Sequence, residues 1–336
     1  MLRAVDSMTR FSPANKAFKK NAVVKIALAS LFVLMFVGLK FWDSYAPVSI
    51  HDWNEKEISE IKLTDPADLA FAVFGDNKGN VSFFEPLLRD IDRNKEIAFA
   101  IDVGDLVGDG KREQYRRFLN QVHENLKIPL LATIGNHDLN RGSGNYQEIF
   151  GPTYYAFQTG QAYFLLLDAI TESGFDKAEL SWLENELQKG QGFKARFVFM
   201  HVPPFDPRGN GFNKCLPEKD GNDLLDLFRR YKVTHVFASH LHGYYSGVWD
   251  GVPYTITGGG GAALQGSDPQ HFFHHYVKAH VNNGKVAVTV RRIDSQGVMA
   301  NLFELMEDSI LQWGSLIGAC VSLLSLGLSL RSRDGS

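Results

Sequence analysis

The segment LAFAVFGDNK, residues 69–78, joins a continuous apolar run to a glycine, an aspartate and further polar residues. A short apolar run bounded in this way predicts a buried β-strand. Asp76 then stands where the strand passes into a loop. In open α/β sheets the carboxyl ends of strands form binding sites, because the strands are rigid while the loops leave room for a ligand.

Four more apolar, strand-like segments end in polar residues in the same way. They are residues 97–103, before Gly104-Asp105; residues 128–134, before Gly135-Asn136-His137-Asp138; residues 196–200, before His201; and residues 233–238, before Ser239-His240-Leu241-His242. Five such strand ends would bring carboxylate, amide and imidazole groups onto one stiff platform. Mixed oxygen and nitrogen ligands of this kind suit manganese, iron or zinc.

The order of these residues resembles that of the calcineurin-like metallophosphoesterases. The pattern of that family is D-x-H, then G-D, then G-N-H-D or G-N-H-E, then a lone histidine, then G-H-x-H. The match spans roughly residues 69–290, and the glycine run at 258–261 is also similar to bacterial members. The resemblance implies an α/β fold of four layers, with two packed mixed β-sheets flanked by helices.

The resemblance also implies two divalent or trivalent metal ions, bridged by the carboxylate of Asp105. Two such ions lower the pKa of a bridging water and stabilise the attacking and leaving oxygens of a phosphate ester. The implied ligands of one ion are Asn136, His201 and His240, and those of the other are Asp76 and His242. In an extended chain, two histidines that are two residues apart point to the same side.

Three further residues have implied roles beside the metals. His137 would stabilise or protonate the leaving oxygen without binding metal, with Asp138 holding its ring. Lys78 and Asn136 are expected to contact the substrate. The predicted catalytic pair is therefore His137 and Asp138.

The chain departs from the family pattern at Lys78, which stands where D-x-H has its histidine. An ammonium group cannot ligate a metal until it loses its proton. The tyrosine that the purple acid phosphatase branch has after G-D is also absent from residues 106–109. Three outcomes are open: Lys78 contacts the substrate phosphate as a point charge, another residue such as Asp109 or His274 fills the gap, or one metal is weak and exchangeable. We favour the first combined with the third.

Ser239 replaces the glycine that the family has before H-x-H. A small residue still fits there unless the backbone φ angle must be positive. Taken singly, each aspartate would be interpreted as a helix cap or turn former. The whole set in this order favours the metal site, whereas His271, His274 and His275 lie in an aromatic stretch and are expected to be packed or surface residues.

Residues 22–42 form an apolar stretch long enough to cross a bilayer, and the basic residues 1–21 precede it. This pattern predicts a membrane anchor with a cytoplasmic N-terminus. A cleavable signal is the competing interpretation, but Tyr45-Ala46-Pro47 places a proline where cleavage would fall.

Residues 309–330 form a second apolar stretch, which leads into a basic tail at 331–336. We expect a second transmembrane helix with a cytoplasmic end, and an amphipathic or core helix is the alternative. Gly314 and Gly318 have the G-x-x-x-G spacing that permits close helix packing. Two cytoplasmic ends would leave the catalytic domain on the extracytoplasmic side of the cell membrane.

Residues 43–66 are expected to be a polar linker into a metallophosphoesterase domain at 67–300. Helical spacing of apolar residues predicts helices over 83–93, 112–125, 177–188 and 221–231. Further strands are expected over 154–157, 163–168, 252–257, 275–280 and 285–291. Because the later strands lack helices between them, the sheets should include antiparallel pairs.

The chain has 336 residues, of which 44% are hydrophobic, and a net charge of -3. This balance argues against a surface that coats nucleic acid. The sequence predicts a membrane-anchored phosphoesterase that hydrolyses phosphomonoesters or phosphodiesters by in-line attack of a metal-activated hydroxide. A catalytically degenerate, membrane-tethered phosphate-binding or scaffold module is the alternative, and an extracytoplasmic nuclease is a third possibility. The natural substrate and the oligomeric state stay open.

Overall fold

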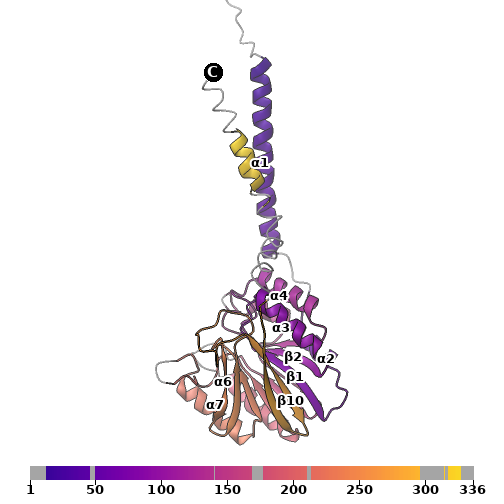
Figure 1. The fold of residues 1–336 in the computed structure, drawn as a ribbon, viewed down its shortest axis with the longest axis vertical. Helices are drawn as coiled ribbons and strands as arrows, with labels where there is room; N and C mark the ends of the chain where they lie inside the picture. The colour runs from indigo at the N-terminus through magenta and orange to yellow at the C-terminus, as the bar shows by residue number, and fades with distance from the viewer. Residues whose placement is uncertain are drawn as a thin grey trace, which may run out of the picture. The chain divides into compact units, whose positions relative to one another are not determined.

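The computed structural model describes residues 13–45, 50–139, 141–168, 177–209, 213–295, 314 and 317–326. The chain forms two compact units (Figure 1). One unit comprises residues 1–46 and 302–336, and the other comprises residues 47–301.

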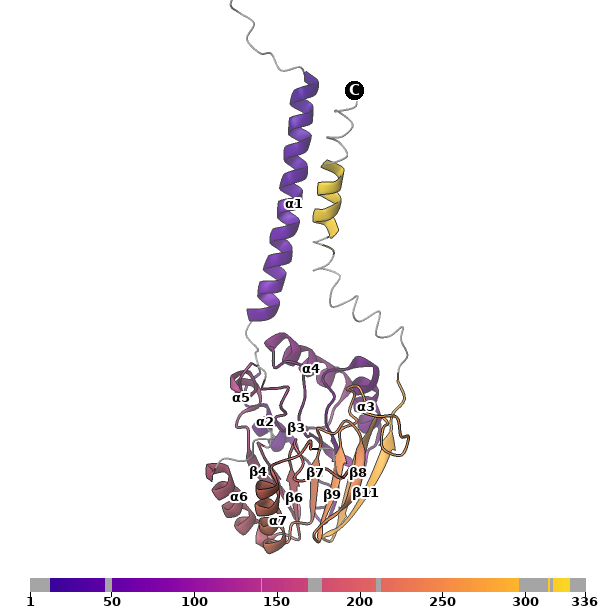
Figure 2. The same cartoon turned by 90° about the vertical axis from the view of Figure 1, so that its left-hand side faces the viewer.

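Residues 47–301 contain two mixed β-sheets (Figure 2). The first has the order β11-β10-β1-β2-β3. Its strands are β1 (Asp68–Phe74), β2 (Ile97–Asp102), β3 (Leu130–Ala132), β10 (His275–Asn282) and β11 (Lys285–Arg292). The pairs β1–β2 and β2–β3 are parallel, whereas β10 pairs antiparallel with both β1 and β11. The carboxyl ends of β1, β2 and β3 therefore lie at one edge of the sheet.

The second sheet has the order β4-β5-β6-β7-β9-β8. Its strands are β4 (Tyr155–Thr159), β5 (Ala162–Leu166), β6 (Ala195–Phe199), β7 (His235–Ala238), β8 (Tyr244–Trp249) and β9 (Val252–Thr257). The inner strands β5, β6, β7 and β9 run parallel, and the edge strands β4 and β8 pair antiparallel with their neighbours. The expected antiparallel pairs are confirmed, although β8 itself was not predicted.

Helices cover the outer faces of both sheets. Their bounds are α2 (Trp53–Glu60), α3 (Val81–Arg93), α4 (Arg112–Asn125), α5 (Gly144–Phe150), α6 (Lys177–Lys189), the 3-10 turn η1 (Gly190–Gly192) and α7 (Glu218–Arg230). Helices α3 and α4 lie by the first sheet, and α6 and α7 lie by the second (Figures 1 and 2). Their apolar side chains belong to the same buried clusters as those of the adjacent strands. The expected four-layer fold of two mixed sheets flanked by helices is confirmed.

A phenylalanine cluster lies between the two sheets. The ring of Phe71 on β1 stacks on Phe99 of β2, with centroids 5.4 Å apart and planes 8° apart. The same ring meets the edges of Phe164 and Phe197, at 5.4 and 5.2 Å, from the opposing sheet. Because side chains alternate along a strand, neighbours such as Phe74 face the helical layer instead. Both faces of β1 are therefore buried, which explains its continuous apolar sequence.

The expected linker over residues 43–66 is wrong for residues 53–60, because these form α2, which belongs to the folded domain. The indole N–H of Trp53 donates to the Leu130 carbonyl at 2.7 Å. The Asn54 side chain donates to the Ala132 carbonyl at 3.2 Å and accepts from the Ala132 N–H at 2.9 Å. These bonds satisfy the free edge of β3, so polar residues here pair with a sheet edge rather than with water.

The first unit contains α1 (Pro13–Tyr45), within which residues 21–39 are long and apolar enough to span a membrane. An apolar helix over Ile317–Leu326 lies beside α1 (Figures 1 and 2), and is too short to count as a span. Lys25 Nζ donates to the Ser325 carbonyl at 3.1 Å, and a Cβ at Gly318 would lie 3.0 Å from the Phe32 ring. Most of the remaining predicted span at 309–330 falls outside the described residues and stays a prediction.

We expect Phe71→Ala to lower the free energy of unfolding by about 3–5 kcal/mol, because it opens a cavity between rings of both sheets. Val290→Ala is the matched control, since Val290 is 39% exposed on β11. Its expected cost is below about 0.5 kcal/mol. Urea denaturation followed by circular dichroism measures both values. Equal losses in the two variants would contradict the central place of Phe71.

The buried His235 on β7 predicts an acid-sensitive fold. Burial lowers the pKa of His235 to about 4, and its Nε2 lies 2.9 Å from Thr255 Oγ1. A pKa depressed in the folded state favours the neutral ring, so stability is complete above the unfolded pKa, about 6.5, and is lost as pH falls toward 4. We expect His235→Gln, which carries no titrating ring, to remove about 3 kcal/mol of the loss measured between pH 7 and pH 4. An unchanged slope would refute this.

Candidate metal centre

The structure places every predicted metal ligand in a loop directly after a strand. Asp76 follows β1, Asp105 follows β2 and Asn136 follows β3 in the first sheet. In the second sheet, His201 follows β6, and His240 and His242 follow β7. The loops meet because the parallel strands of both sheets end at the same edge of the sandwich. Asp76, Asp105 and His201 alone offer three donor atoms within 4.8 Å of one another.

Four donor atoms surround what we call the first position. Asn136 Oδ1 lies 3.1 Å from both His201 Nε2 and His240 Nδ1, and these two nitrogens are 3.3 Å apart. Asp105 Oδ1 lies 3.4 Å from His201 Nε2. Donors held about 2.1 Å from one ion in a tetrahedral arrangement are about 3.4 Å apart. The residues present therefore fit a transition-metal ion.

The histidine rings are oriented by backbone carbonyls. His201 Nδ1 lies 2.9 Å from the Val103 carbonyl oxygen, and His242 Nδ1 lies 2.6 Å from that of Ala263. A carbonyl accepts, so each Nδ1 carries the proton and each Nε2 presents its lone pair to the cluster. Metal-binding histidines in proteins typically have this outer hydrogen bond, which fixes the ring tautomer.

The second position lies between Asp76, His242 and Asp105. Asp76 Oδ1 is 3.1 Å from His242 Nε2. The other oxygen of Asp76 accepts from the His240 backbone N–H at 2.7 Å and from the hydroxyl of Ser239. Ser239, a departure from the family pattern, therefore orients a carboxylate at the centre, which the sequence did not reveal.

Lys78 projects into this second position. Its Nζ lies 3.3 Å from Asp105 Oδ2 and 3.5 Å from His242 Nε2. The alternatives considered for the gap are engaged elsewhere, because Asp109 forms ion pairs with Lys111 at 2.8 Å and Arg141 at 3.2 Å. The ring of His274 stacks on Phe83, and its Nδ1 lies 3.2 Å from the Gly259 carbonyl oxygen. The second position remains one ligand short.

Many residues at the centre have a left-handed backbone conformation. Nine described residues other than glycine have positive φ, and five of them form this site. Their φ angles are 56° for Asp76, 49° for Lys78, 59° for Asp105, 70° for His240 and 33° for His242. The expected extended loop at the two histidines is therefore wrong. Strained residues of this kind persist where surrounding structure holds them, typically at functional sites.

Two glycines of the motifs are required by close approach. A Cβ at Gly135 would lie 2.4 Å from Asp105 Oδ1, and one at Gly258 would lie 2.7 Å from Asp76 Oδ2. The glycine run is also joined to the β1 loop, since the Ala262 N–H donates to the Asp76 carbonyl at 2.7 Å. Any side chain at these glycines would displace a carboxylate of the centre.

Asp138 holds the loops rather than the His137 ring, which corrects the expectation. Its buried carboxylate accepts from the backbone N–H groups of Gly135 at 2.9 Å, Asp105 at 3.0 Å, Leu106 at 3.2 Å and Val107 at 3.2 Å. The His137 ring is held by its Nδ1, which lies 2.9 Å from the Gly108 carbonyl oxygen. Its Nε2 points toward Asp105 Oδ2 at 3.9 Å.

Burial and neighbouring charges set the protonation of these groups. Burial and the adjacent His201 lower the pKa of His240 to about 3, so its ring is neutral and able to bind a metal at pH 7. Burial opposes ionisation of Asp76, but hydrogen bonding to His242 and the charge of His201 outweigh it and lower its pKa. Burial and the charge of Asp138 raise the pKa of Asp102 well above its ordinary value. Asn77, another residue without a sequence signal, donates to Asp102 Oδ2 at 2.6 Å.

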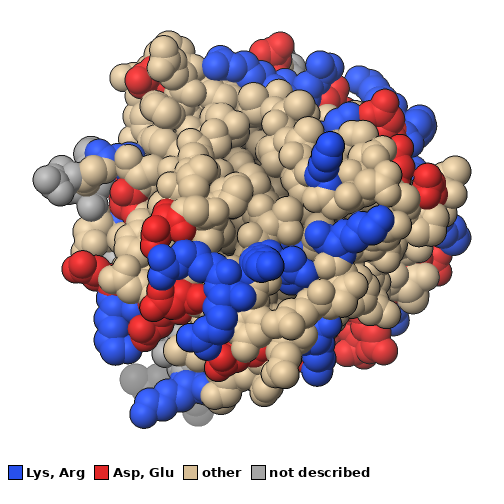
Figure 3. All heavy atoms as spheres, turned by 90° about the horizontal axis from the view of Figure 1, so that it is seen from below, with Lys and Arg blue, Asp and Glu red and all other residues tan. Residues whose placement is uncertain are grey.

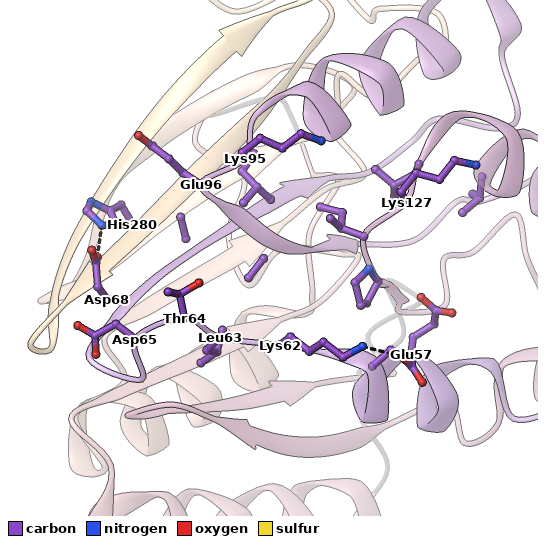
Figure 4. A pocket seen from close by; sticks show the side chains of 18 of the residues that line it. Glu57, Lys62, Leu63, Thr64, Asp65, Asp68, Lys95, Glu96, Lys127 and His280 are labelled. Carbon is purple, nitrogen blue, oxygen red and sulfur yellow. Dashed lines mark hydrogen bonds and ion pairs between the residues drawn. The ribbon is translucent and has the colours of Figure 1, made fainter.

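A separate hollow of about 770 Å³ lies at the opposite ends of β1 and β2 (Figure 4). Side chains of both charges line it, including Lys62, Lys95, Asp65 and Glu96. None of the candidate metal ligands is among its lining residues. On the face of the molecule seen from below in Figure 3, basic and acidic side chains also lie close together.

The three later histidines pack as expected. His271 stacks on Tyr245, with ring centroids 4.4 Å apart, and its Nδ1 lies 2.9 Å from the Tyr244 carbonyl oxygen. His275 is fully buried, and burial lowers its pKa to about 4. The rings of His274 and His275 lie against Gly259 of the glycine run.

Known proteins are similar to this chain in sequence and in fold. The family model for calcineurin-like phosphoesterases matches residues 69–244, just over half of the 336 residues. The chain therefore belongs to the calcineurin-like phosphoesterase family.

The curated relatives include phosphodiesterases and phosphatases. A probable cyclic nucleotide phosphodiesterase of Rhodopseudomonas palustris is 29% identical over 177 residues, which cover 49% of this chain and 64% of the relative. The serine/threonine-protein phosphatase CPPED1 of Rattus norvegicus is 28% identical over 194 residues, which cover 51% of this chain and 62% of the relative. The chain thus spans less than two thirds of these relatives.

A purple acid phosphatase from yellow lupin seeds has a similar structure, with a TM-score of 0.57 at 17% identity. The likeness covers 67% of this chain and 51% of the lupin chain. At this identity it shows the fold alone.

We expect Asp138→Asn to lower the free energy of unfolding of the metal-free protein by about 2–3 kcal/mol, because an amide N–H₂ would face backbone donors in a buried site. Tyr115→Phe removes the hydroxyl that lies 3.3 Å from both the backbone carbonyl oxygen and the Oδ1 of Asp138, and should cost about 1 kcal/mol. Denaturant unfolding in a chelator measures both. A stable Asp138→Asn protein that had lost only activity would instead assign Asp138 to the chemistry.

Proposed function

We propose that this protein hydrolyses phosphate esters at a metal centre formed by Asp105, Asn136, His201 and His240. The observation that carries this proposal is the convergence of their four donor atoms at separations of 3.1 to 3.4 Å. The names of the relatives, phosphodiesterases and phosphatases, support the same class of reaction. Manganese, iron and zinc suit this mixture of oxygen and nitrogen donors.

The metal would supply positive charge to the phosphate and acidify a water molecule. A water oxygen bonds to phosphorus and releases one proton to solvent while the bond to the ester oxygen breaks, so the departing oxygen needs a proton. We assign that proton to His137, whose Nε2 faces the cluster while its Nδ1 is held by Gly108. We expect Asn136 to contact the substrate as well as the metal.

We propose that α1 anchors the protein in a membrane. The apolar segment at 21–39 has the length of a span, and the basic residues before it favour a cytoplasmic N-terminus. The catalytic domain would then lie on the extracytoplasmic side. Its substrate would be a phosphomonoester or phosphodiester present there.

A second candidate is a membrane-tethered phosphate-binding module without turnover, which is favoured by Lys78 in place of a metal ligand. Both candidates bind metal at the first position. They differ in whether a bound ester is cleaved.

We expect Asp105→Ala to abolish metal binding at the first position and to lower turnover by at least about 10³-fold, since it removes a ligand common to the centre. His137→Ala should retain metal and lose about 10²-fold in kcat. Release of p-nitrophenol from p-nitrophenyl phosphate and bis(p-nitrophenyl) phosphate measures turnover, and elemental analysis measures metal.

Asp68→Ala is the control, because Asp68 pairs with His280 at the opposite end of β1 and should leave turnover unchanged. Metal bound in full without cleavage of either ester, or of further phosphoesters, would reject the enzyme in favour of the binding module. Turnover that survives chelation and Asp105→Ala would reject the metal centre.

A further inference from the structure

Lys78 is held in the centre by its backbone as well as by its side chain. Its N–H donates to the Asp105 carbonyl at 3.0 Å, and its φ of 49° turns the side chain back toward the cluster. The side chain is 20% exposed, and that of Asp105 is 1% exposed. Lys78 is thus a built part of the site rather than a surface lysine that happens to reach it.

The ammonium group takes the partners that a second metal would need. A metal at the second position would be held by Asp76, His242 and Oδ2 of Asp105, the carboxylate oxygen that is not part of the first position. Lys78 Nζ already lies 3.3 Å from that Asp105 oxygen and 3.5 Å from His242 Nε2. An ammonium has N–H donors and no lone pair, so it competes with a metal for these acceptors and cannot join them as a ligand.

Electrostatic repulsion also prevents the Lys78 ammonium and a metal ion from occupying the second position together. An ammonium and a metal ion at this same position would be in direct contact and repel strongly, with no carboxylate between them and little water to screen them. The two buried carboxylates, Asp76 and Asp105, instead attract a single cation at this position. Because Lys78 stands where the family has a neutral histidine, its own ammonium group can be that cation.

We propose that the Lys78 ammonium occupies the second cation position, so that this protein holds one metal ion per chain. This inference rests on the proposed phosphoesterase function. Lys78 has three N–H groups, of which two face Asp105 and His242. The third donates to a phosphate oxygen of the substrate and neutralises charge that a second metal would otherwise balance.

Metal stoichiometry tests the proposal directly. The full-length protein in detergent is stripped with chelator, loaded with excess Mn²⁺, desalted and analysed for manganese. The wild-type chain should hold one ion, and Lys78→His, which restores an imidazole ligand, should hold two. Lys95→His is the matched control, because Lys95 is 81% exposed and lies at the opposite end of the strands, and it should stay at one.

Electron paramagnetic resonance gives a second readout that does not depend on activity. One isolated Mn²⁺ gives a six-line spectrum, whereas two ions about 3.5–4 Å apart couple magnetically. We expect the isolated spectrum in the wild type and the coupled spectrum in Lys78→His. Two coupled ions in the wild type would overturn the proposal, and so would a single ion in a folded Lys78→His protein. Neither result would contradict the proposed phosphoesterase activity.

The catalytic contribution of the ammonium is tested by Lys78→Met, which keeps the chain length and removes the charge. We expect one ion to remain bound and kcat to fall about 10²-fold, as when a donor that stabilises transition-state charge is removed. Lys95→Met should keep the wild-type kcat. An unchanged kcat in Lys78→Met would remove the lysine from the chemistry, and absence of both metal and turnover in the wild type would instead reject the proposed function.

Discussion

The buried carboxylate of Asp138 is the constraint on which the centre depends. It binds the N–H groups of the loops after β2 and β3, and so fixes where Asp105 and Asn136 stand relative to each other. A carboxylate that accepts several backbone N–H groups has few alternative arrangements, since each unpaired donor would be costly in a buried site. These bonds therefore hold the two loops together in the arrangement that brings Asp105 and Asn136 to the centre.

This rigidity allows the strained backbone at the centre. Asp76, Asp105 and the two histidines after β7 adopt left-handed conformations that an isolated loop would avoid. The cost is offset by bonds between loops from different sheets, such as those that Ser239 and the His240 N–H make to Asp76. The phenylalanine cluster beneath holds the two sheets together, and hence holds the two halves of the centre at bonding distance.

Much of the fold followed from local patterns. The five strands that carry the site, the helices α3, α4, α6 and α7 and the antiparallel later strands were anticipated, because each has an apolar or periodic stretch. The helices α2 and α5 and the strand β8 were missed. The polar side chain of Asn54 pairs with a sheet edge, and β8 is an exposed edge strand, so neither carries a strong apolar pattern.

The sequence alone identified the residues that gather at the centre, because a metal site needs particular donor groups and these occur in a recognisable order. It also showed that Lys78 leaves one position short of a ligand. The roles of Asp138, Ser239 and Asn77 emerged only from the folded chain, since each acts through contacts between loops far apart in sequence. Where the Lys78 ammonium lies was likewise decided by packing, because a lysine side chain can reach many places and only its surroundings select one.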